Sequence, residues 1–398
     1  MTAVCFYFQV HQPVRLKKFS LFADNLPESL MERYFDDEAN RGIFNKVSDK
    51  CYIPANAAIL KLIEENGGKF RVSYSLTGSF LEQAKKYRPD VIESFRALAK
   101  TGCVEFLNET YYHSLSSLFE DKTEFVEQVR LHSEELNSLF KSSGKVFRNT
   151  EALFSNDIAR LAEELGFEGI VAEGFESVLG WRSPNYLYSV RGAQKIKALL
   201  RNYKLSDDVS YRFSARWWPE WPLTAEKYAK WLAGAPGQCV NLFMDYETFG
   251  EHQWKETGIF DFLAALPREA LKYRHIEFMT PTEVVRDNPA VGEIDVQKPI
   301  SWADMERDTS AWLGNGMQRE CFRMLEGFDL KVRKARDAEA AHAWRLLQNS
   351  DHLYYLCTKS WADGDVHKYF SPFSSPYDGF INYMNILQDF RQEVEKER

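Results

Sequence analysis

The chain has 398 residues, which is enough for a barrel-sized domain with an additional part, and 44% of its residues are apolar, which provides for a large core. Its net charge of −8 argues against a general nucleic-acid binder, because such proteins carry a basic surface. No apolar run approaches the roughly 18 residues of a membrane span, and the first residues lack the features of a signal peptide, so we expect no membrane segment and a cytoplasmic protein.

Side-chain composition adds two expectations. Aromatic residues make up 15% of the chain; most will belong to the core, but the excess suits a sugar binder, because sugar C–H faces stack on rings. The six cysteines are scattered without CxxC spacing, so we expect buried thiols rather than disulfides or a zinc site.

Short apolar runs alternate with longer amphipathic segments over most of the chain. The apolar runs, which we predict to be strands, are residues 4–10, 70–76, 103–107, 146–148, 169–172, 198–201 and 239–244. The predicted helices between them include residues 52–66, 89–100, 122–141 and 157–165. This alternation predicts an α/β protein with a parallel sheet, and seven such strands favour a closed barrel over an open sheet.

The pattern changes near residue 290. Residues 276–279 are predicted to form one more short strand, and residues 319–348 are rich in Ala, Glu, Leu and Arg, which favours long helices. We therefore predict a catalytic domain over residues 1–290. Residues 291–398 should form a helical C-terminal domain that packs on the barrel and contributes to the substrate cleft.

Four predicted strands end in, or contain, side chains that can do chemistry. His11 follows the first strand, Glu105 lies in the third, Glu151 follows the fourth and Asp245 ends the seventh. Barrel enzymes place their reactive groups at the carboxyl ends of the strands, so these residues are candidates for one site. Two carboxylates from different strands suit glycoside hydrolysis, in which one attacks the anomeric carbon and the other protonates the leaving oxygen.

The order of these motifs resembles glycoside hydrolase family 57, the retaining α-amylase and α-glucanotransferase family. The matching segments are His11-Gln12-Pro13, Gly102-Cys103-Val104-Glu105, the segment around Glu151, Met244-Asp245-Tyr246-Glu247-Thr248-Phe249-Gly250, and, more weakly, residues 306–315. The segment before Glu151 lacks the tryptophan that often precedes the nucleophile in this family, which leaves the subfamily open.

The resemblance implies a distorted TIM-like (β/α)7 barrel with a helical C-terminal domain. It implies that Glu151 is the nucleophile and Asp245 the acid/base. It also implies that His11, Glu105, Asp308 and Trp312 belong to the substrate site.

Further candidates for substrate contact come from the residues near these motifs. They are His113, Glu247 and His252, the tryptophans Trp218 and Trp221, and Asp207 or Asp208. Residues 361–370 resemble a segment that could close over the site, although a structural turn at Asp363-Gly364 explains the same pattern.

The leading functional hypothesis is an α-amylase that hydrolyses α-1,4 bonds of maltodextrin, starch or glycogen without metal or cofactor, and without nucleic-acid or membrane partners. The same intermediate allows 4-α-glucanotransferase or branching activity. Two other classes stay open: a metal-dependent barrel enzyme, which the scattered histidines disfavour, and a non-catalytic glucan-binding protein. The sequence does not indicate the oligomeric state or a dedicated calcium loop.

Overall fold

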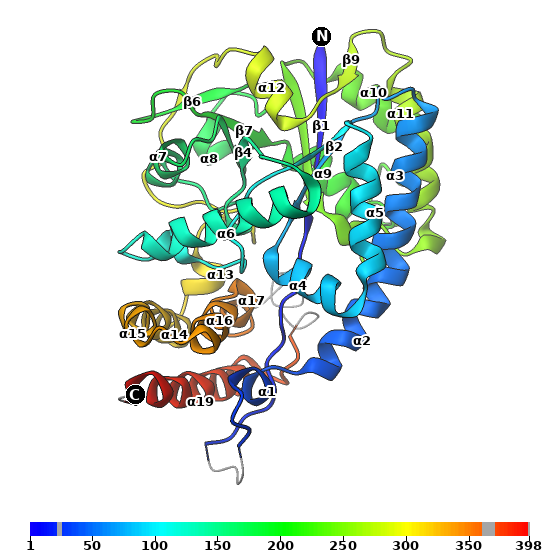
Figure 1. Ribbon diagram of the computed structural model, residues 1–398. Coiled ribbons are helices and arrows are strands. Elements are labelled where there is room, and N and C mark those ends of the chain that lie inside the picture. Colours follow the sequence, from blue (N-terminus) through cyan, green and yellow to red (C-terminus); the bar gives the residue numbers. More distant parts are fainter. Residues whose placement is uncertain (22–25, 360–370, 397–398) are drawn as a thin grey trace.

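The structure is a computed structural model that describes residues 1–21, 26–359 and 371–396. Its centre is a set of parallel strands surrounded by helices (Figure 1). The strands of this set are β1 (Thr2–Val10), β2 (Val72–Leu76), β3 (Val104–Phe106), β4 (Val146–Phe147), β5 (Gly169–Glu173), β7 (Lys197–Arg201) and β8 (Cys239–Asp245). The α/β class predicted from the sequence is therefore confirmed.

The strands form two sheets that meet at both edges. The first sheet has the order β3-β2-β1-β8, and the second has β10 (Glu293–Ile294), β6 (Tyr188–Val190), β7, β5 and β4 in that order. Asn108, just after β3, pairs in parallel with Phe147 of β4, and the Asn202 N–H after β7 donates to the Asn241 carbonyl of β8 at 2.9 Å. A few hydrogen bonds at each of these two edges join the seven strands into a ring that is irregular rather than evenly hydrogen-bonded.

The buried strands explain the near-continuous apolar runs. All residues of β1 after Thr2 are buried, and its phenylalanines pack beneath the helices of the first sheet. Strands that are covered on both faces favour apolar side chains on both faces, which is why an alternating pattern is absent from residues 3–8.

Helices cover the outside of this ring (Figure 1). They are α1 (Leu30–Tyr34), α2 (Asp37–Val47), α3 (Ile53–Glu65), α4 (Gly78–Tyr87), α5 (Pro89–Lys100), α6 (Thr123–Phe140), α7 (Asn156–Glu164), α8 (Glu176–Leu179), α9 (Tyr203–Ser210), α10 (Ala225–Gly234), α11 (Ile259–Ala270) and α12 (Pro281–Asp287). Several begin where the sequence supplies a cap: the Thr77 hydroxyl accepts the Phe80 N–H at the start of α4, and Pro89 occupies the first turn of α5.

The C-terminal part is helical and lies beyond the carboxyl ends of the strands (Figure 1). Its helices are α13 (Ser310–Leu313), α14 (Gly316–Gly327), α15 (Asp329–Ala335), α16 (Ala338–Leu347), α17 (Ser350–Tyr354) and α19 (Pro376–Glu395). Arg33, on α1, forms ion pairs with Asp389 and Glu393 on α19, so the segment that follows β1 packs against the last helix.

The element bounds differ from the sequence-based prediction in a few places. Residues 319–348 form three helices rather than long ones, because Arg336 adopts a left-handed φ of 52° and Asp337 caps a new helix. Strands β6 and β10 were not predicted, whereas β9 (Ile276–Phe278) lies where the sequence indicates it.

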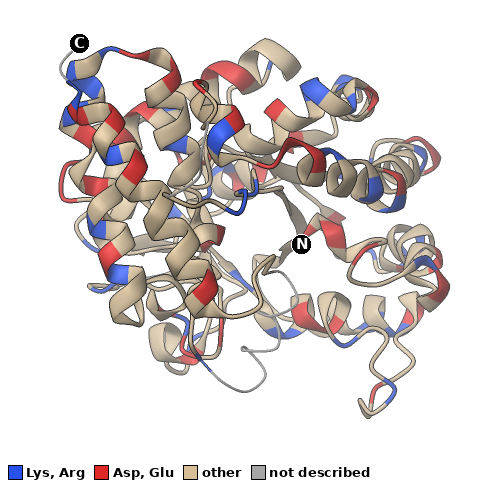
Figure 2. Cartoon of the chain, turned by 90° about the horizontal axis from the view of Figure 1, so that it is seen from below, with Lys and Arg blue, Asp and Glu red and all other residues tan. Residues whose placement is uncertain are grey.

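The distribution of charged residues and the hydropathy of the helices bear on the expectations for nucleic-acid binding and for membrane insertion. Acidic and basic residues are mixed over the elements, without a one-sided basic face in this view (Figure 2). No helix among the described residues is long and apolar enough to cross a membrane.

Candidate active site

Glu151 lies in a short 3-10 turn, Thr150–Ala152, directly after β4. Its backbone adopts a left-handed φ of 57°, a conformation that costs energy for a residue with a side chain. The Glu151 carbonyl accepts the Trp302 N–H at 3.2 Å, which helps to hold this backbone in place. Strain of this kind, supported by a second segment, is common where a side chain must point in one direction for function.

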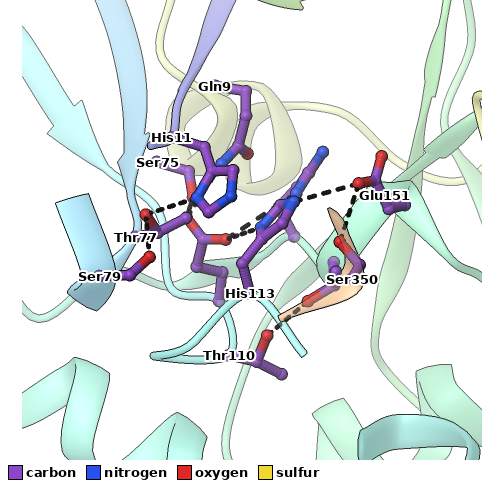
Figure 3. A network of polar contacts seen from close by, with 12 residues as sticks. Gln9, His11, Ser75, Thr77, Ser79, Thr110, His113, Glu151 and Ser350 are labelled. Atoms are coloured by element: carbon purple, nitrogen blue, oxygen red, sulfur yellow. Dashed lines mark hydrogen bonds and ion pairs between the residues drawn. The ribbon is translucent and has the colours of Figure 1, made fainter. Parts of the chain in front are cut away.

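Three donors from three segments bind the Glu151 carboxylate. His113 Nε2 lies 3.2 Å from Oε1, and the Ser350 hydroxyl donates to the same oxygen at 3.1 Å (Figure 3). Trp302 Nε1 donates to Oε2 at 3.0 Å. Because Trp302 and Ser350 follow residue 300, the C-terminal part completes the surroundings of a residue that the barrel presents.

These donors stabilise the ionised form of Glu151. Burial alone would raise the pKa of its carboxyl, but the hydrogen bond and charge of His113, together with the charge of Arg148, lower that pKa below its ordinary value. Arg148 itself is fully buried, and its guanidinium lies 4.7 Å from the centre of the Trp302 ring. None of its three guanidinium nitrogens has a hydrogen-bond partner among the described residues, so the side chain contributes charge rather than a direct bond.

Asp245 ends β8, and its surroundings have the opposite effect. Burial raises the pKa of its carboxyl; the nearby His252, Arg148 and Arg201 oppose this, while the negative charge of Glu151 adds to it. The net direction is upward, which favours the protonated acid. A carboxylic acid that stays protonated can donate a proton to a leaving group.

Glu247 adds a second acid beside Asp245. Its carboxylate accepts the Tyr52 hydroxyl at 2.5 Å, and burial, followed by the charge of Asp245, raises the pKa of Glu247 to about 8. The negative charge of Asp245 therefore favours the neutral form of Glu247.

His11 and His113 stack against each other with ring centres 3.9 Å apart (Figure 3). His11 Nδ1 faces the Thr77 hydroxyl at 2.9 Å, and His11 Nε2 faces Asp351 Oδ2 at 3.0 Å, which fits a neutral ring that accepts from Thr77 and donates to Asp351. Burial, followed by the charge of His113, lowers the pKa of His11.

The same residues include a group with metal-ligand spacing. One ligand atom from each of His11, His113 and Asp351 falls within 4.8 Å of the others. The ring nitrogens of both histidines face hydroxyl or carboxylate oxygens in this arrangement, so we assign no metal to it.

The structure brings some sequence-predicted residues together and separates others. Glu151, Asp245, His11, His113 and Glu247 lie in one connected cluster, and His252 is close enough to Asp245 to affect its pKa. The side chains of three expected substrate contacts, Glu105, Asp308 and Trp312, lie elsewhere.

The side chains of Glu105, Asp308 and Trp312 make contacts that stabilise the fold. The Glu105 carboxylate accepts the Thr282 N–H at 2.9 Å at the start of α12, and it therefore caps a helix. Asp308 accepts the Ser310 N–H at 2.7 Å at the start of α13. Trp312 is only 1% exposed within the core of the C-terminal part, so a sugar cannot reach its ring without unpacking that core.

The remaining candidates lie outside this polar cluster or beyond the described residues. Trp218 packs against Trp231 with ring centres 6.1 Å apart, and Trp221 is 44% exposed. Asp207 forms an ion pair with Arg201, and Asp208 forms one with Arg212. Residues 361–370, expected to close over the site or to form a turn, lie outside the residues that the structure describes.

Sequence reasoning missed several residues of the cluster. They are Glu109, Arg148, Trp302, Ser350 and Asp351. Glu109 and Arg148 lie in segments that were already singled out, so their proximity to the motifs was a usable signal. Trp302, Ser350 and Asp351 belong to the C-terminal part, and only the fold brings them to Glu151 and His11.

Comparison with known proteins identifies the family. Residues 5–297 match the sequence model of Glycosyl hydrolase family 57. The chain belongs to this family. It is 48% identical over 403 aligned positions to a Methanocaldococcus jannaschii protein named "Putative alpha-amylase", an alignment that covers 99% of this chain and 85% of the relative.

Two solved structures superpose on this chain over nearly its whole length. A branching enzyme of this family from Thermococcus kodakaraensis superposes with a TM-score of 0.70 at 13% identity, over 98% of this chain and 90% of its own. A 4-alpha-glucanotransferase from Thermococcus litoralis gives a TM-score of 0.65 at 17% identity, over 98% of this chain and 60% of its own. These likenesses confirm the expected fold class, a (β/α)7 barrel with helices.

Proposed function

We propose that this family 57 member is a retaining glycoside hydrolase that cleaves α-1,4-glucans, with Glu151 as nucleophile and Asp245 as acid/base. In the first step Glu151 attacks the anomeric carbon while Asp245 gives its proton to the leaving oxygen. In the second step the Asp245 carboxylate takes a proton from water, which attacks the same carbon and releases Glu151. The sugar keeps its anomeric configuration because each step inverts it once.

The observation that carries this proposal is the opposite shift in pKa of the two acids. A nucleophile must be ionised, and hydrogen bonds and cations lower the pKa of Glu151. A general acid must be protonated, and burial raises the pKa of Asp245. The division of roles follows from these environments.

Glycosyl transfer is a second candidate, because a sugar hydroxyl could attack the same intermediate in place of water. The names of the solved neighbours, a 4-alpha-glucanotransferase and a branching enzyme, support this alternative. The name of the relative that is 48% identical supports hydrolysis.

Incubation with maltoheptaose, followed by chromatography and proton NMR, tests the proposal. We expect shorter maltooligosaccharides, a rising number of reducing ends, and new reducing ends that are released as the α-anomer. Longer and shorter products with constant reducing ends would indicate a glucanotransferase. Release of the β-anomer would contradict retention, and unchanged maltoheptaose would contradict activity on α-1,4-glucans.

A further inference from the structure

His113 connects two buried carboxylates. Its Nε2 lies 3.2 Å from Glu151 Oε1, and its Nδ1 lies 3.3 Å from Glu109 Oε2. With a carboxylate at each ring nitrogen, both nitrogens have an acceptor, and only the protonated imidazole can donate to both at once. The geometry therefore favours a chain of charges in the order carboxylate, imidazolium, carboxylate.

The far end of this chain is fixed by the barrel. Glu109 is fully buried; its Oε1 accepts the Ser75 hydroxyl and, at 3.4 Å, the amide of Gln9, and Arg148 lies 3.8 Å from its Oε2. Burial alone would raise the pKa of Glu109, but His113 and Arg148 lower it to about 2. The Glu109 carboxylate of the folded protein is therefore ionised near neutral pH.

The backbone at His113 is also held in one conformation. His113 adopts a left-handed φ of 53°, and its carbonyl accepts the Ser350 N–H at 3.0 Å. Glu151 has the same kind of backbone, with its carbonyl bound by Trp302. Ser350 and Trp302 therefore act in the same way. The backbone N–H of each donates to the carbonyl of a residue with a left-handed φ, and the side chain of each donates to the Glu151 carboxylate.

Substrate contact does not explain His113. Its side chain is 3% exposed, its two nitrogens face carboxylates, and one face of its ring is covered by His11. A sugar hydroxyl would have to displace Glu109 or Glu151 to bind it. The expectation that His113 binds substrate directly is therefore replaced by a different role.

We propose that His113 is a positioning residue for Glu151: a protonated imidazole, held by Glu109, that fixes one oxygen of the Glu151 carboxylate and keeps that carboxylate charged. This inference rests on the proposed function, in which Glu151 is the nucleophile. The charged or titratable groups that face this unit are His11, Glu109, His132, Arg148, Glu151 and Asp351.

The electrostatic balance at His113 agrees with this role. Burial alone would lower the pKa of its imidazole, but the hydrogen bonds and charges of Glu109 and Glu151 raise it to about 9. The neighbouring His132 is the contrast within the same region: it accepts the Glu109 N–H at 3.2 Å, and burial lowers its pKa, so it is neutral.

The test compares His113→Asn with Ser350→Ala, using α-maltosyl fluoride as substrate. Asn tolerates the left-handed backbone but is too short to reach Glu151, and it removes the charge. Ser350→Ala removes a neutral donor from the same Glu151 oxygen. Fluoride leaves without a proton from Asp245, so the rate reports on the attack by Glu151.

We expect His113→Asn to lower kcat/KM by about 10- to 100-fold and to move the acidic limb of its pH profile upward by about one unit, because Glu151 loses its positive neighbour. Ser350→Ala should lower the rate less and leave that limb close to its wild-type position. An acidic limb that does not move in folded His113→Asn protein, as judged by circular dichroism, would overturn the proposal.

A measurement without substrate separates this inference from the proposed function. In protein labelled with 15N-histidine, the His113 ring, assigned by its absence in His113→Asn, should stay doubly protonated at pH 8. Glu109→Gln should lower its titration midpoint. A His113 ring that is neutral at pH 8 overturns the positioning role, whereas a charged ring in a protein inactive on α-glucans overturns only the proposed function.

Discussion

The two strand ends that carry Glu151 and Asp245 provide opposite surroundings. Around Glu151, after β4, the chain places an imidazolium, a buried guanidinium, an indole N–H and a hydroxyl. Around Asp245, at the end of β8, it places a second acid, Glu247, whose carboxyl also has a raised pKa. The pKa values of two chemically similar carboxyls are thereby shifted in opposite directions, which suits the proposed nucleophile and the proposed acid.

This difference shows which part of the molecule decides the chemistry. Strands β4 and β8 deliver the two carboxyls. The neighbours that shift their pKa values come from the segment after β3, from Arg148 after β4, from Arg201 at the end of β7, from the turn after β8, and from the C-terminal part. Enzymes that use paired carboxylates commonly divide the roles in this way, through environment rather than through residue type.

The largest expected effect comes from Glu151→Gln. Replacement of the nucleophile should lower kcat on maltoheptaose on the order of 10⁴-fold, because no other group can form the covalent intermediate. Glu105→Gln is the matched control: its carboxylate caps α12, so we expect nearly wild-type kcat. Activity that survives in Glu151→Gln, or that disappears in folded Glu105→Gln, would reverse the assignment of these two glutamates.

Asp245→Asn should have a smaller effect that depends on the leaving group. Loss of general acid catalysis lowers the rate on maltoheptaose by about 10²- to 10⁴-fold. With α-maltosyl fluoride, whose leaving group needs no proton, the first step should recover most of its rate. An equal loss on both substrates would show that Asp245 is not the acid.

Trp302 and Trp312 allow a tryptophan that contacts Glu151 to be compared with one that is buried in the core. Trp302→Phe removes the indole N–H that donates to Glu151 Oε2, so kcat/KM should fall about 10-fold. Trp312→Phe removes part of a ring that is buried in the core of the C-terminal part, away from Glu151, so we expect a lower melting temperature and unchanged kcat/KM. Steady-state kinetics well below both melting temperatures checks the contrast; equal kcat/KM losses would remove Trp302 from the site.

The smallest effect concerns Glu247. Glu247→Gln puts a neutral amide in place of a carboxyl whose pKa is about 8, so the negative charge that Glu247 gains above about pH 8 is lost and the pKa of Asp245 should fall there. Because the general acid must be protonated, the alkaline limb of the pH profile of kcat/KM should then move to lower pH, by less than about one unit. A limb that moves upward or stays in place would mean that another group determines it.

The sequence predicted the strands and the two central carboxyls, because buried strands give long apolar runs and Glu151 and Asp245 follow two of them directly. It also predicted His11, His113 and Glu247, within a few residues of those strand ends, as substrate contacts; that role stays a prediction for His11 and Glu247, and for His113 we propose the positioning of Glu151 instead. The error at Trp312 has a physical reason: a tryptophan near a motif reads the same whether its ring faces a sugar or a core.

Trp302, Ser350 and Asp351 could not be predicted in this way. They lie more than a hundred residues from Glu151 along the chain and follow no strand. Their contribution depends on how the C-terminal part packs beyond the carboxyl ends of the strands, and local patterns carry no information on that packing.

Azide rescue is the most direct test of the central claim, that Glu151 attacks and Asp245 protonates. Glu151→Ala and Asp245→Ala are each incubated with α-maltosyl fluoride and sodium azide, and the product is identified by NMR. We expect β-maltosyl azide from Glu151→Ala, because azide replaces the nucleophile, and α-maltosyl azide from Asp245→Ala, because azide attacks the glycosyl-enzyme. The reverse pair of anomers would contradict the central claim.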